Sequence, residues 1–394
     1  MFDKLNAQPQ DKILKLMGAY KADVRKNKID LGVGVYKDAS GSTPIMRAVK
    51  AAENQLWKNQ ETKSYVGLAG DPEFASSMFD LVLGTAVSPD HLAAIATPGG
   101  TGAVRQALEL IKLAAPTATV WFSNPTWPNH LSIVTHLEIN RSEYRYFDSK
   151  TGAVDFDGMQ ADIESIPSGD VVLLHGCCHN PTGANLTSEQ EDQIIEILSN
   201  NGVIPFVDIA YQGFGDGLEQ DARFTRKLAS RLPQCLIAAS CSKNFGIYRE
   251  RTGILIAVTP NLKQQTITQE NLAFLNRQNF SFPPDHGARL VTMILGSGNL
   301  RKSWIQELEE TRLNMLDLRQ KLASQLCQKT NSDRFNFLGH HRGMFSRIGI
   351  SPNQVEKIRT DFGVYMVDDS RINIAGLNKH TVPLLATAIT QILK

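Results

Sequence analysis

The chain has 394 residues, of which 42% are hydrophobic and 21% are charged, and its formal net charge is +1. This length is enough for two domains, and the composition is ordinary for a soluble globular protein. The balanced charge offers no basic surface for nucleic acid. No apolar run approaches the about 20 residues that a membrane-spanning helix needs, and the first residues show no signal-peptide pattern. We therefore expect neither nucleic acid nor membrane as a partner.

The five cysteines are spread irregularly, apart from the neighbours Cys177 and Cys178. They are too few and too irregular for a disulfide framework, and adjacent cysteines bridge only with strain. The cysteines are therefore predicted to be reduced, which is typical of a cytoplasmic location.

Short apolar segments alternate with helical patterns through the first 300 residues. The predicted strands are 94–97, 120–122, 171–175, 203–207, 236–239 and 253–258. A helix is predicted over about 103–113, and another opens at a capping box over Ser188–Glu191. Fully apolar strands separated by helices predict an α/β fold with a mostly parallel sheet that is covered on both faces.

The pattern changes after about residue 300. One face of a long helix is marked by Ile305, Leu308, Met315, Leu318 and Leu322. This helix is predicted to lead into a second, smaller domain that completes the chain.

Polar residues stand just past the ends of several predicted strands, namely Gly100, Asn180, Asp208 and Lys243. In open α/β sheets, ligands bind at the carboxyl ends of the strands. The sequence therefore predicts a binding site at this edge of the sheet.

Lys243 directly follows an apolar strand and two serines. A lysine that is held deprotonated by burial forms a Schiff base with an aldehyde. Ser240, Ser242 and Arg251 could hold a phosphate beside it, and an aldehyde with a phosphate indicates pyridoxal 5′-phosphate. Taken alone, Lys243 would be read as a solvated surface residue.

Other segments supply partners for such a cofactor. Asp208 could pair with a protonated ring nitrogen, although a helix N-cap is an equal alternative. Tyr211 and Asn180 could bond the phenolate oxygen, and Trp127 could stack on the ring or lie in the core. Arg371 could bind a carboxylate bidentately or form a surface ion pair.

Two alternative cofactors are disfavoured by spacing. Two histidines and two cysteines lie within 175–179, but no second cluster completes a zinc site, so no metal is predicted. The loop over 99–102 joins a strand to a helix, where backbone N–H groups favour an anion. It lacks the Gly-x-Gly-x-x-Gly spacing and the early position of a nicotinamide fingerprint.

Together these segments resemble one family, the class I aminotransferases of the aspartate and aromatic amino-acid group, over nearly the whole chain. The matching segments are LGVGVYKD (31–38), KSYVGL (63–68), GGTG (99–102), NPTWPNH (124–130), HGCCHNPTG (175–183), DIAYQGF (208–214), SKNFG (242–246) and SRINIAG (370–376). Each segment is moderately specific, and their order makes the resemblance specific.

The resemblance implies pyridoxal phosphate as cofactor, with Lys243, Asp208 and Tyr65 as catalytic residues. Tyr65 is expected to reach the phosphate in the neighbouring subunit of a homodimer, and His130 is expected to support Asp208. The implied cofactor residues are Gly99, Gly100, Thr101, Trp127, Asn180, Asp208, Tyr211, Ser240, Ser242, Lys243, Arg251 and Tyr65. The implied substrate residues are Gly34, Trp127, Asn180, Arg277 and Arg371.

The fold that the resemblance implies is fold type I of the pyridoxal-phosphate enzymes. A large domain (44–310) would carry the mostly parallel central sheet flanked by helices. A smaller α/β domain would combine 12–43 with 311–394, preceded by an N-terminal arm (1–11). The small domain is expected to close over substrate.

Arg277 matches the family arginine that pairs with a substrate side-chain carboxylate, which implies aspartate and 2-oxoglutarate as substrates. Phe282 stands where aspartate-selective relatives usually have asparagine, and bacterial aromatic amino-acid aminotransferases are more similar here. We expect ping-pong transfer from phenylalanine, tyrosine, tryptophan and aspartate to 2-oxoglutarate. The alternative is a plain aspartate aminotransferase. A lyase or decarboxylase and a non-enzymatic regulator are disfavoured.

Overall fold

The computed structural model describes residues 1–8 and 11–394, so Pro9 and Gln10 of the predicted N-terminal arm lie outside the described residues. A seven-stranded sheet forms the centre, in the order β2-β10-β9-β8-β7-β3-β4. The strands are β2 (Leu92–Pro98), β3 (Val120–Asn124), β4 (Arg141–Arg145), β7 (Val171–His175), β8 (Ile204–Ile209), β9 (Cys235–Ser240) and β10 (Thr252–Val258). All neighbours from β9 to β4 are parallel, whereas β10 runs antiparallel to both β9 and β2. The predicted mostly parallel sheet is confirmed.

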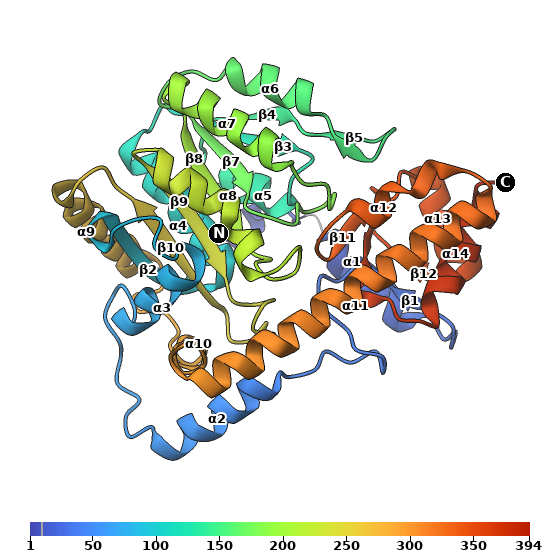
Figure 1. Cartoon of the computed structure of the whole chain (residues 1–394), viewed down its shortest axis with the longest axis horizontal. Coiled ribbons are helices and arrows are strands. Elements are labelled where there is room, and N and C mark those ends of the chain that lie inside the picture. Colours follow the sequence, from blue (N-terminus) through green and yellow to red (C-terminus); the bar gives the residue numbers. More distant parts are fainter. Residues whose placement is uncertain (9–10) are drawn as a thin grey trace.

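Helices cover both faces of this sheet (Figure 1). The helices of this part of the chain are α2 (Arg47–Asn59), α3 (Pro72–Val82), α4 (Gly99–Ala114), α5 (Pro128–His136), α6 (Phe156–Glu164), α7 (Ser188–Asn201), α8 (Leu218–Arg231), α9 (Leu262–Asn279) and α10 (His286–Gly296). Of these, α2 packs mainly against α10 and α11 (Gly298–Thr330), away from the sheet. Successive strand residues enter opposite cores: Val207 and Ile237 belong to one, Phe206 and Leu236 to the other. Because both faces are buried, the strands read as continuous apolar runs.

A separate C-terminal core forms where α11 runs from the sheet to α14 (Thr381–Ile392) (Figure 1). On α11, Met315 belongs to a core of the sheet and Leu318 to the C-terminal core. The predicted domain boundaries at 43/44 and 310/311 stay a prediction. The other elements are α1 (Lys12–Ala22), β1 (Ile29–Asp30), β5 (Phe147–Asp148), β6 (Ala153–Val154), α12 (Phe337–His340), β11 (Phe345–Arg347), α13 (Pro352–Phe362), β12 (Val364–Tyr365), β13 (Arg371–Asn373), α14 (Thr381–Ile392) and four short 3-10 turns.

Three local predictions need correction. Helix α4 begins at Gly99 instead of about residue 103, so the glycine loop is its first turn. The capping box of α7 uses Thr187 with Gln190, one residue earlier than predicted. Ile305 is 41% exposed because the neighbouring Trp304 occupies the inward position on α11.

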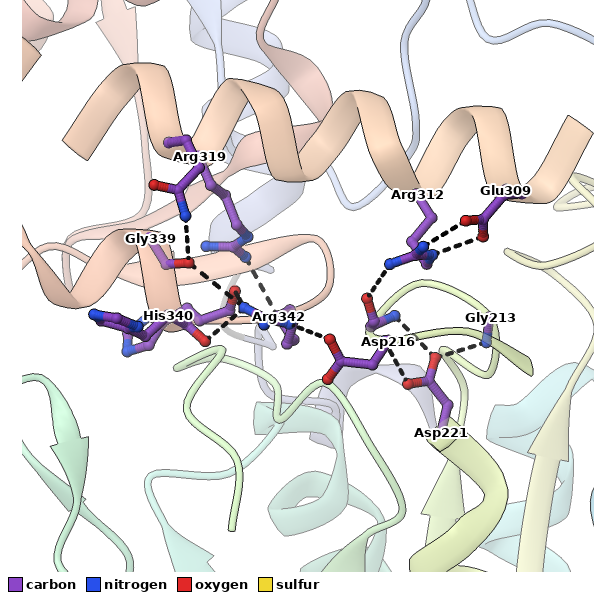
Figure 2. Close-up of polar contacts among 12 residues, drawn as sticks. Gly213, Asp216, Asp221, Glu309, Arg312, Arg319, Gly339, His340 and Arg342 are labelled. Carbon is purple, nitrogen blue, oxygen red and sulfur yellow. Dashed lines mark hydrogen bonds and ion pairs between the residues drawn. The ribbon is translucent and has the colours of Figure 1, made fainter. Parts of the chain in front are cut away.

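The loop after β8 is held against α11 and the chain before β11 (Figure 2). Arg312 pairs with Glu309 on its own helix and donates to the carbonyl of Gly215 at 3.3 Å. Arg342 Nε donates to the carboxylate of Asp216 at 2.6 Å. These contacts join the sheet and the C-terminal region close to the carboxyl end of β8. In the part of the chain that the structure describes, no helix is both long and apolar enough to cross a bilayer.

Candidate active site

A cavity of about 220 Å³ lies where β7, β8 and β9 end and α4 begins. Its lining includes most of the predicted site residues: Gly34, Gly100, Thr101, Trp127, Asn180, Asp208, Tyr211, Ser240, Ser242, Lys243, Arg251 and Arg371. Residues from positions 34 to 371 therefore meet at the strand ends, as the sequence predicts for an open α/β sheet.

Asp208 ends a buried strand and is bonded to a buried histidine. His130 Nε2 lies 2.9 Å from Asp208 Oδ2, and its Nδ1 lies 2.9 Å from Thr126 Oγ1. Burial raises the pKa of Asp208, but the hydrogen bond and charge of His130, together with the charges of His175 and Lys243, outweigh it, so the pKa of the carboxyl is lowered. The expected support of Asp208 by His130 is thus present as a contact, and Asp208 is not a solvated helix cap.

Lys243 is partly buried above the ring of Tyr211, with Nζ 4.9 Å from the ring centroid. Burial lowers the pKa of this amine, the charge of Asp208 raises it, and Arg251 lowers it further; the net shift is downward. A lysine whose ammonium form is disfavoured is suited to nucleophilic chemistry. The alternative of a solvated surface lysine is wrong.

Asn180 faces the same cavity beside Tyr211. Its Nδ2 lies 3.5 Å from the Tyr211 hydroxyl, while Oδ1 is buried and has no hydrogen-bond partner among the described residues. Burial and then the charge of Asp208 raise the pKa of Tyr211, so this phenol remains a donor. The bond between Asn180 and Pro181 is cis. The pair presents polar atoms for a ligand oxygen.

An anion-binding cradle forms at the N-terminus of α4. Gly99 has a φ of +73°, and a Cβ there would lie 2.4 Å from the Arg251 guanidinium. A Cβ at Gly100 would lie 2.9 Å from Ser240. Arg251 Nη1 lies 3.4 Å from Ser242 Oγ. Close backbone approach, a helix N-terminus and an arginine are what phosphate binding requires.

Arg371 is 4% exposed, which excludes the surface ion pair that it could have formed. It donates to the carbonyl of Gly32 at 2.8 Å and lies 4.4 Å from the ring centroid of Phe345. Among the described residues no carboxylate lies within 4.0 Å of it, and its Nε has no partner. Its guanidinium can therefore accept a carboxylate from a ligand.

Three predicted site residues do not line this cavity: Gly99, which directly precedes the lining residue Gly100, and the distant Tyr65 and Arg277. Tyr65 is 83% exposed and Arg277 is also exposed. The ring of Tyr65 stacks on Phe282 at 4.8 Å, and the guanidinium of Arg277 lies 5.6 Å from the centroid of Phe282. Together with the half-buried Phe282, the exposed Tyr65 and Arg277 form one surface group that is separate from the cavity of their own chain.

Sequence reasoning missed several lining residues, namely Ile13, His175, Ala210, Tyr248 and Phe345. Tyr248 follows the lysine segment closely, and its hydroxyl accepts a hydrogen bond from the amide of Tyr36 at 3.2 Å. Ala210 and His175 adjoin strand ends, which was an available signal. Nothing local indicates Ile13 or Phe345, because only the chain fold brings them here.

The histidine and cysteine cluster does not form one metal site. Both ring nitrogens of His179 have partners, Ser123 at 3.0 Å and Thr182 at 2.8 Å. Among the residues described, the side chains close enough to share an ion are instead Cys177, Cys178 and Asp221. The Asp221 carboxylate is already occupied, because it accepts three backbone N–H bonds. The absence of a metal stays a prediction.

Comparison with known proteins identifies the family. The model for "Aminotransferase class I and II" matches residues 26–389. The chain is 56% identical to the aromatic-amino-acid aminotransferase of Paracoccus denitrificans and 40% identical to the aspartate aminotransferase of Escherichia coli (strain K12), each over the full length of both chains. The chain therefore belongs to the class I and II aminotransferases and is an enzyme of that family.

Solved structures agree with this assignment. An aromatic amino acid aminotransferase with 3-indolebutyric acid superposes with a TM-score of 0.97, at 56% identity and full coverage of both chains. An aromatic-amino-acid aminotransferase from Burkholderia pseudomallei, covalently bound to pyridoxal phosphate, gives a TM-score of 0.97 at 36% identity, again with full coverage. The family fold with its α/β sheet is thus shared over the whole chain.

Proposed function

We propose that this enzyme uses pyridoxal 5′-phosphate to transfer the amino group of phenylalanine, tyrosine, tryptophan or aspartate to 2-oxoglutarate. The observation that carries the proposal is the single cavity that Lys243, Asp208 and Arg371 line together. The name of the Paracoccus relative supports the aromatic substrates.

The residues present fit the proposed cofactor. Lys243 supplies an amine for its aldehyde, and Asp208 supplies a charge for its ring nitrogen. The side-chain N–H of Asn180 and the hydroxyl of Tyr211 suit its ring oxygen as donors. The cradle of Gly99, Gly100, Thr101, Ser240, Ser242 and Arg251 suits its phosphate. Trp127 would cover the ring.

The protein's part in the reaction follows from these positions. Bound there, pyridoxal phosphate would supply an aldehyde for the amino group and a ring that stabilises negative charge at the substrate α-carbon. Asp208 would hold the proton on the ring nitrogen, with His130 fixing the carboxylate. Lys243 Nζ, disfavoured as an ammonium by burial, would accept the α-proton. Arg371 and the backbone of Gly34 would orient the α-carboxylate.

Shared active sites in a homodimer account for Tyr65 and Arg277. Both are exposed and lie outside the cavity of their own chain. Across a two-fold interface, each subunit would present them to the partner's site, Tyr65 to the phosphate and Arg277 to a substrate side-chain carboxylate.

The substrate range rests on the same group. Arg277 retains the charge that aspartate and 2-oxoglutarate need, which also supports the second candidate, a plain aspartate aminotransferase like the Escherichia coli relative. Phe282 favours the dual range because an apolar ring beside the arginine makes the pocket less dependent on a carboxylate.

Half-reaction kinetics test the proposal. The absorbance change of the bound cofactor would be followed with aspartate and with phenylalanine separately on the purified enzyme. We expect comparable specificity constants. A preference for aspartate by several orders of magnitude would replace the aromatic assignment with the second candidate, and released CO2 or ammonia would overturn transamination.

Replacement of Arg277 tests the substrate assignment. Arg277→Ala should lower kcat/KM for aspartate by about 100-fold, because a charge-assisted bidentate pair is lost, and should leave phenylalanine within about threefold. The ratio of the two specificity constants is the measured quantity. Equal losses on both substrates would contradict the assigned role.

A further inference from the structure

Helix α9 lies along the free edge of β2 and bonds to it through side-chain amides. Gln265 Nε2 donates to the carbonyl of Leu92 at 3.0 Å. Gln269 Oε1 accepts from the amide of Ala94 at 2.8 Å, and its Nε2 donates to the carbonyl of the same residue at 2.9 Å. These bonds occupy edge groups that would otherwise be open to another strand.

The spacing of helix and strand permits this pairing. Four helical residues rise about 6 Å, which is close to the about 6.7 Å of two strand residues. Gln265 and Gln269, four apart, therefore reach Leu92 and Ala94, two apart. These paired bonds set the position of α9 along β2, and therefore the position of the C-terminal end of α9.

Asn276 is the third amide side chain of α9 that bonds to β2, and it is fully buried. Its Nδ2 donates to the carbonyl of Leu68 at 2.8 Å and of Ala96 at 3.1 Å. Its Oδ1 accepts from Gln106 Nε2 at 2.7 Å. One side chain thus joins α9 to β2, to α4, and to the segment that begins at Tyr65.

The backbone of Asn276 shapes the following turn. Its carbonyl accepts from the amides of Phe280 and Ser281 at 3.1 Å and 2.9 Å. Ser281, at a φ of +66°, receives a hydrogen bond from Arg277 Nη1 at 2.5 Å. The next residue is Phe282, on which Tyr65 stacks. Asn276 therefore fixes both stretches of chain that carry Tyr65 and Arg277.

We propose that Asn276 is a positioning residue for the partner's active site, which sets Arg277 and Tyr65 by fastening both to β2 and α4. Gly99 and Gly100 lie at the start of α4, directly after β2. The two elements that form part of one subunit's phosphate cradle therefore also hold Tyr65 and Arg277, which that subunit would contribute to its partner's active site. This inference rests on the proposed roles of Arg277 and Tyr65 in the homodimer.

Asn276→Ala tests the proposal, with Gln265→Ala as matched control because it removes an amide bond to β2 far from Arg277. We expect Asn276→Ala to raise KM for aspartate and lower its kcat/KM by about tenfold, since small misplacements of a binding group are costly. The kcat/KM for phenylalanine should change by no more than about twofold in Asn276→Ala. In Gln265→Ala, the kcat/KM for both substrates should stay within the same twofold range. A raised Kd for pyridoxal phosphate should accompany the displacement of Tyr65.

A double-mutant cycle separates positioning from general destabilisation. If Asn276 acts through Arg277, adding Asn276→Ala to Arg277→Ala should cause no further loss that is selective for aspartate. If the alanine variant does not fold, the measurement can be repeated on the double variant Gln106→Leu/Asn276→Leu, which replaces both bonded amides by apolar side chains that fill the same space. It should show the same selectivity.

Two results would overturn the inference at different levels. Equal losses on both substrates in Asn276→Ala, beside a selective Arg277→Ala, would leave the role of Arg277 intact and refute positioning by Asn276. An unselective Arg277→Ala would refute the proposed role of Arg277, and the inference would fall with it.

Discussion

Two buried arginines differ in what their guanidinium groups contact. Arg319 is fully buried and donates to Ser346 Oγ at 2.7 Å and to the carbonyls of Gly343 and Phe345 at 2.7 Å and 2.6 Å. Burial lowers its pKa to about 9. Its bonds go to the protein itself, so it fixes the chain before and within β11. Both arginines leave Nε without a hydrogen-bond partner among the described residues, but Arg371 lines the cavity and its guanidinium donates only to the carbonyl of Gly32 there. A buried arginine therefore indicates a ligand site when it lines a cavity and the protein does not engage both of its Nη groups.

The buried carboxylate of Asp221 (Figure 2) should make the stability of the protein depend on pH. Burial raises its pKa to about 6, although backbone N–H bonds from Asp216, Gly215 and Gly213 oppose this. Because the folded pKa lies above the unfolded one, the folded state binds more protons between about pH 4 and 6. Its contribution to stability should therefore fall as pH rises through this window, by about 3 kcal/mol in all.

Melting temperatures of the wild type and Asp221→Asn at pH 5 and pH 7.5 measure this effect. The wild type should lose stability relative to the variant as pH rises, because only the wild type ionises. Asp157→Asn, at an exposed position of α6, is the control and should show a constant difference. A constant difference for Asp221→Asn as well would contradict the assignment.

The junction of β2 with α4 decides the cofactor site at the level of elements. The apolar strand was predicted from its composition, but the helix begins four residues earlier than its own pattern indicates. Three glycines in the first turn lower helix propensity, and packing against Ser240, Arg251 and Gly253 compensates for it. Tertiary contacts therefore make the glycine segment, in which the sequence already predicted anion-binding N–H groups, the first turn of α4 instead of a loop before it.

Gly99→Ala should weaken cofactor binding through this junction. Gly99 has a positive φ, and the added methyl group would meet the Arg251 guanidinium at 2.4 Å. We expect the Kd for pyridoxal phosphate to rise by about tenfold or more, as measured by titration of the cofactor-free enzyme. Gly298→Ala, where nothing lies within 4 Å of the new Cβ, should leave it unchanged. An unaltered Kd in Gly99→Ala would contradict the cradle.

Assembly decides the active site at the scale of the whole molecule. The cavity of one chain collects the predicted cofactor residues, whereas Tyr65 and Arg277 form their own surface group with Phe282. Both sets are held by the sheet, one at the strand ends and the other beyond the edge strand β2. A two-fold dimer would bring one set to the other without any change within the chain.

Mixed dimers test this arrangement. Lys243→Ala should be inactive, and Arg277→Ala should be poorly active on aspartate. Refolded together in equal amounts, they should recover about a quarter of wild-type aspartate activity, because half the dimers contain one intact site. Recovery should be absent from unmixed controls. If mixing restores nothing although mixed dimers form, Lys243 and Arg277 do not serve one site across the interface.

The sequence by itself determined the strand and helix alternation, the site at the strand ends and the family. These features have local signals in the sequence. A strand that is buried on both faces is a continuous apolar run, and the polar residues that follow such runs lie at the carboxyl ends of the strands, where ligands bind. The start of α4, the start of α7 and the inward position of Ile305 on α11 were predicted wrongly, because neighbouring packing overrides local preference.

Only the tertiary structure decided which polar groups are buried and which remain free. Arg371 is buried with an unpaired Nε, Lys243 has a lowered pKa, and Asn276 joins α9 to three other segments. The local sequence does not predict these properties, because the partners of each residue lie far away in the chain. Burial and hydrogen bonding depend on how those segments pack, and these properties determine what a charged or amide side chain can do.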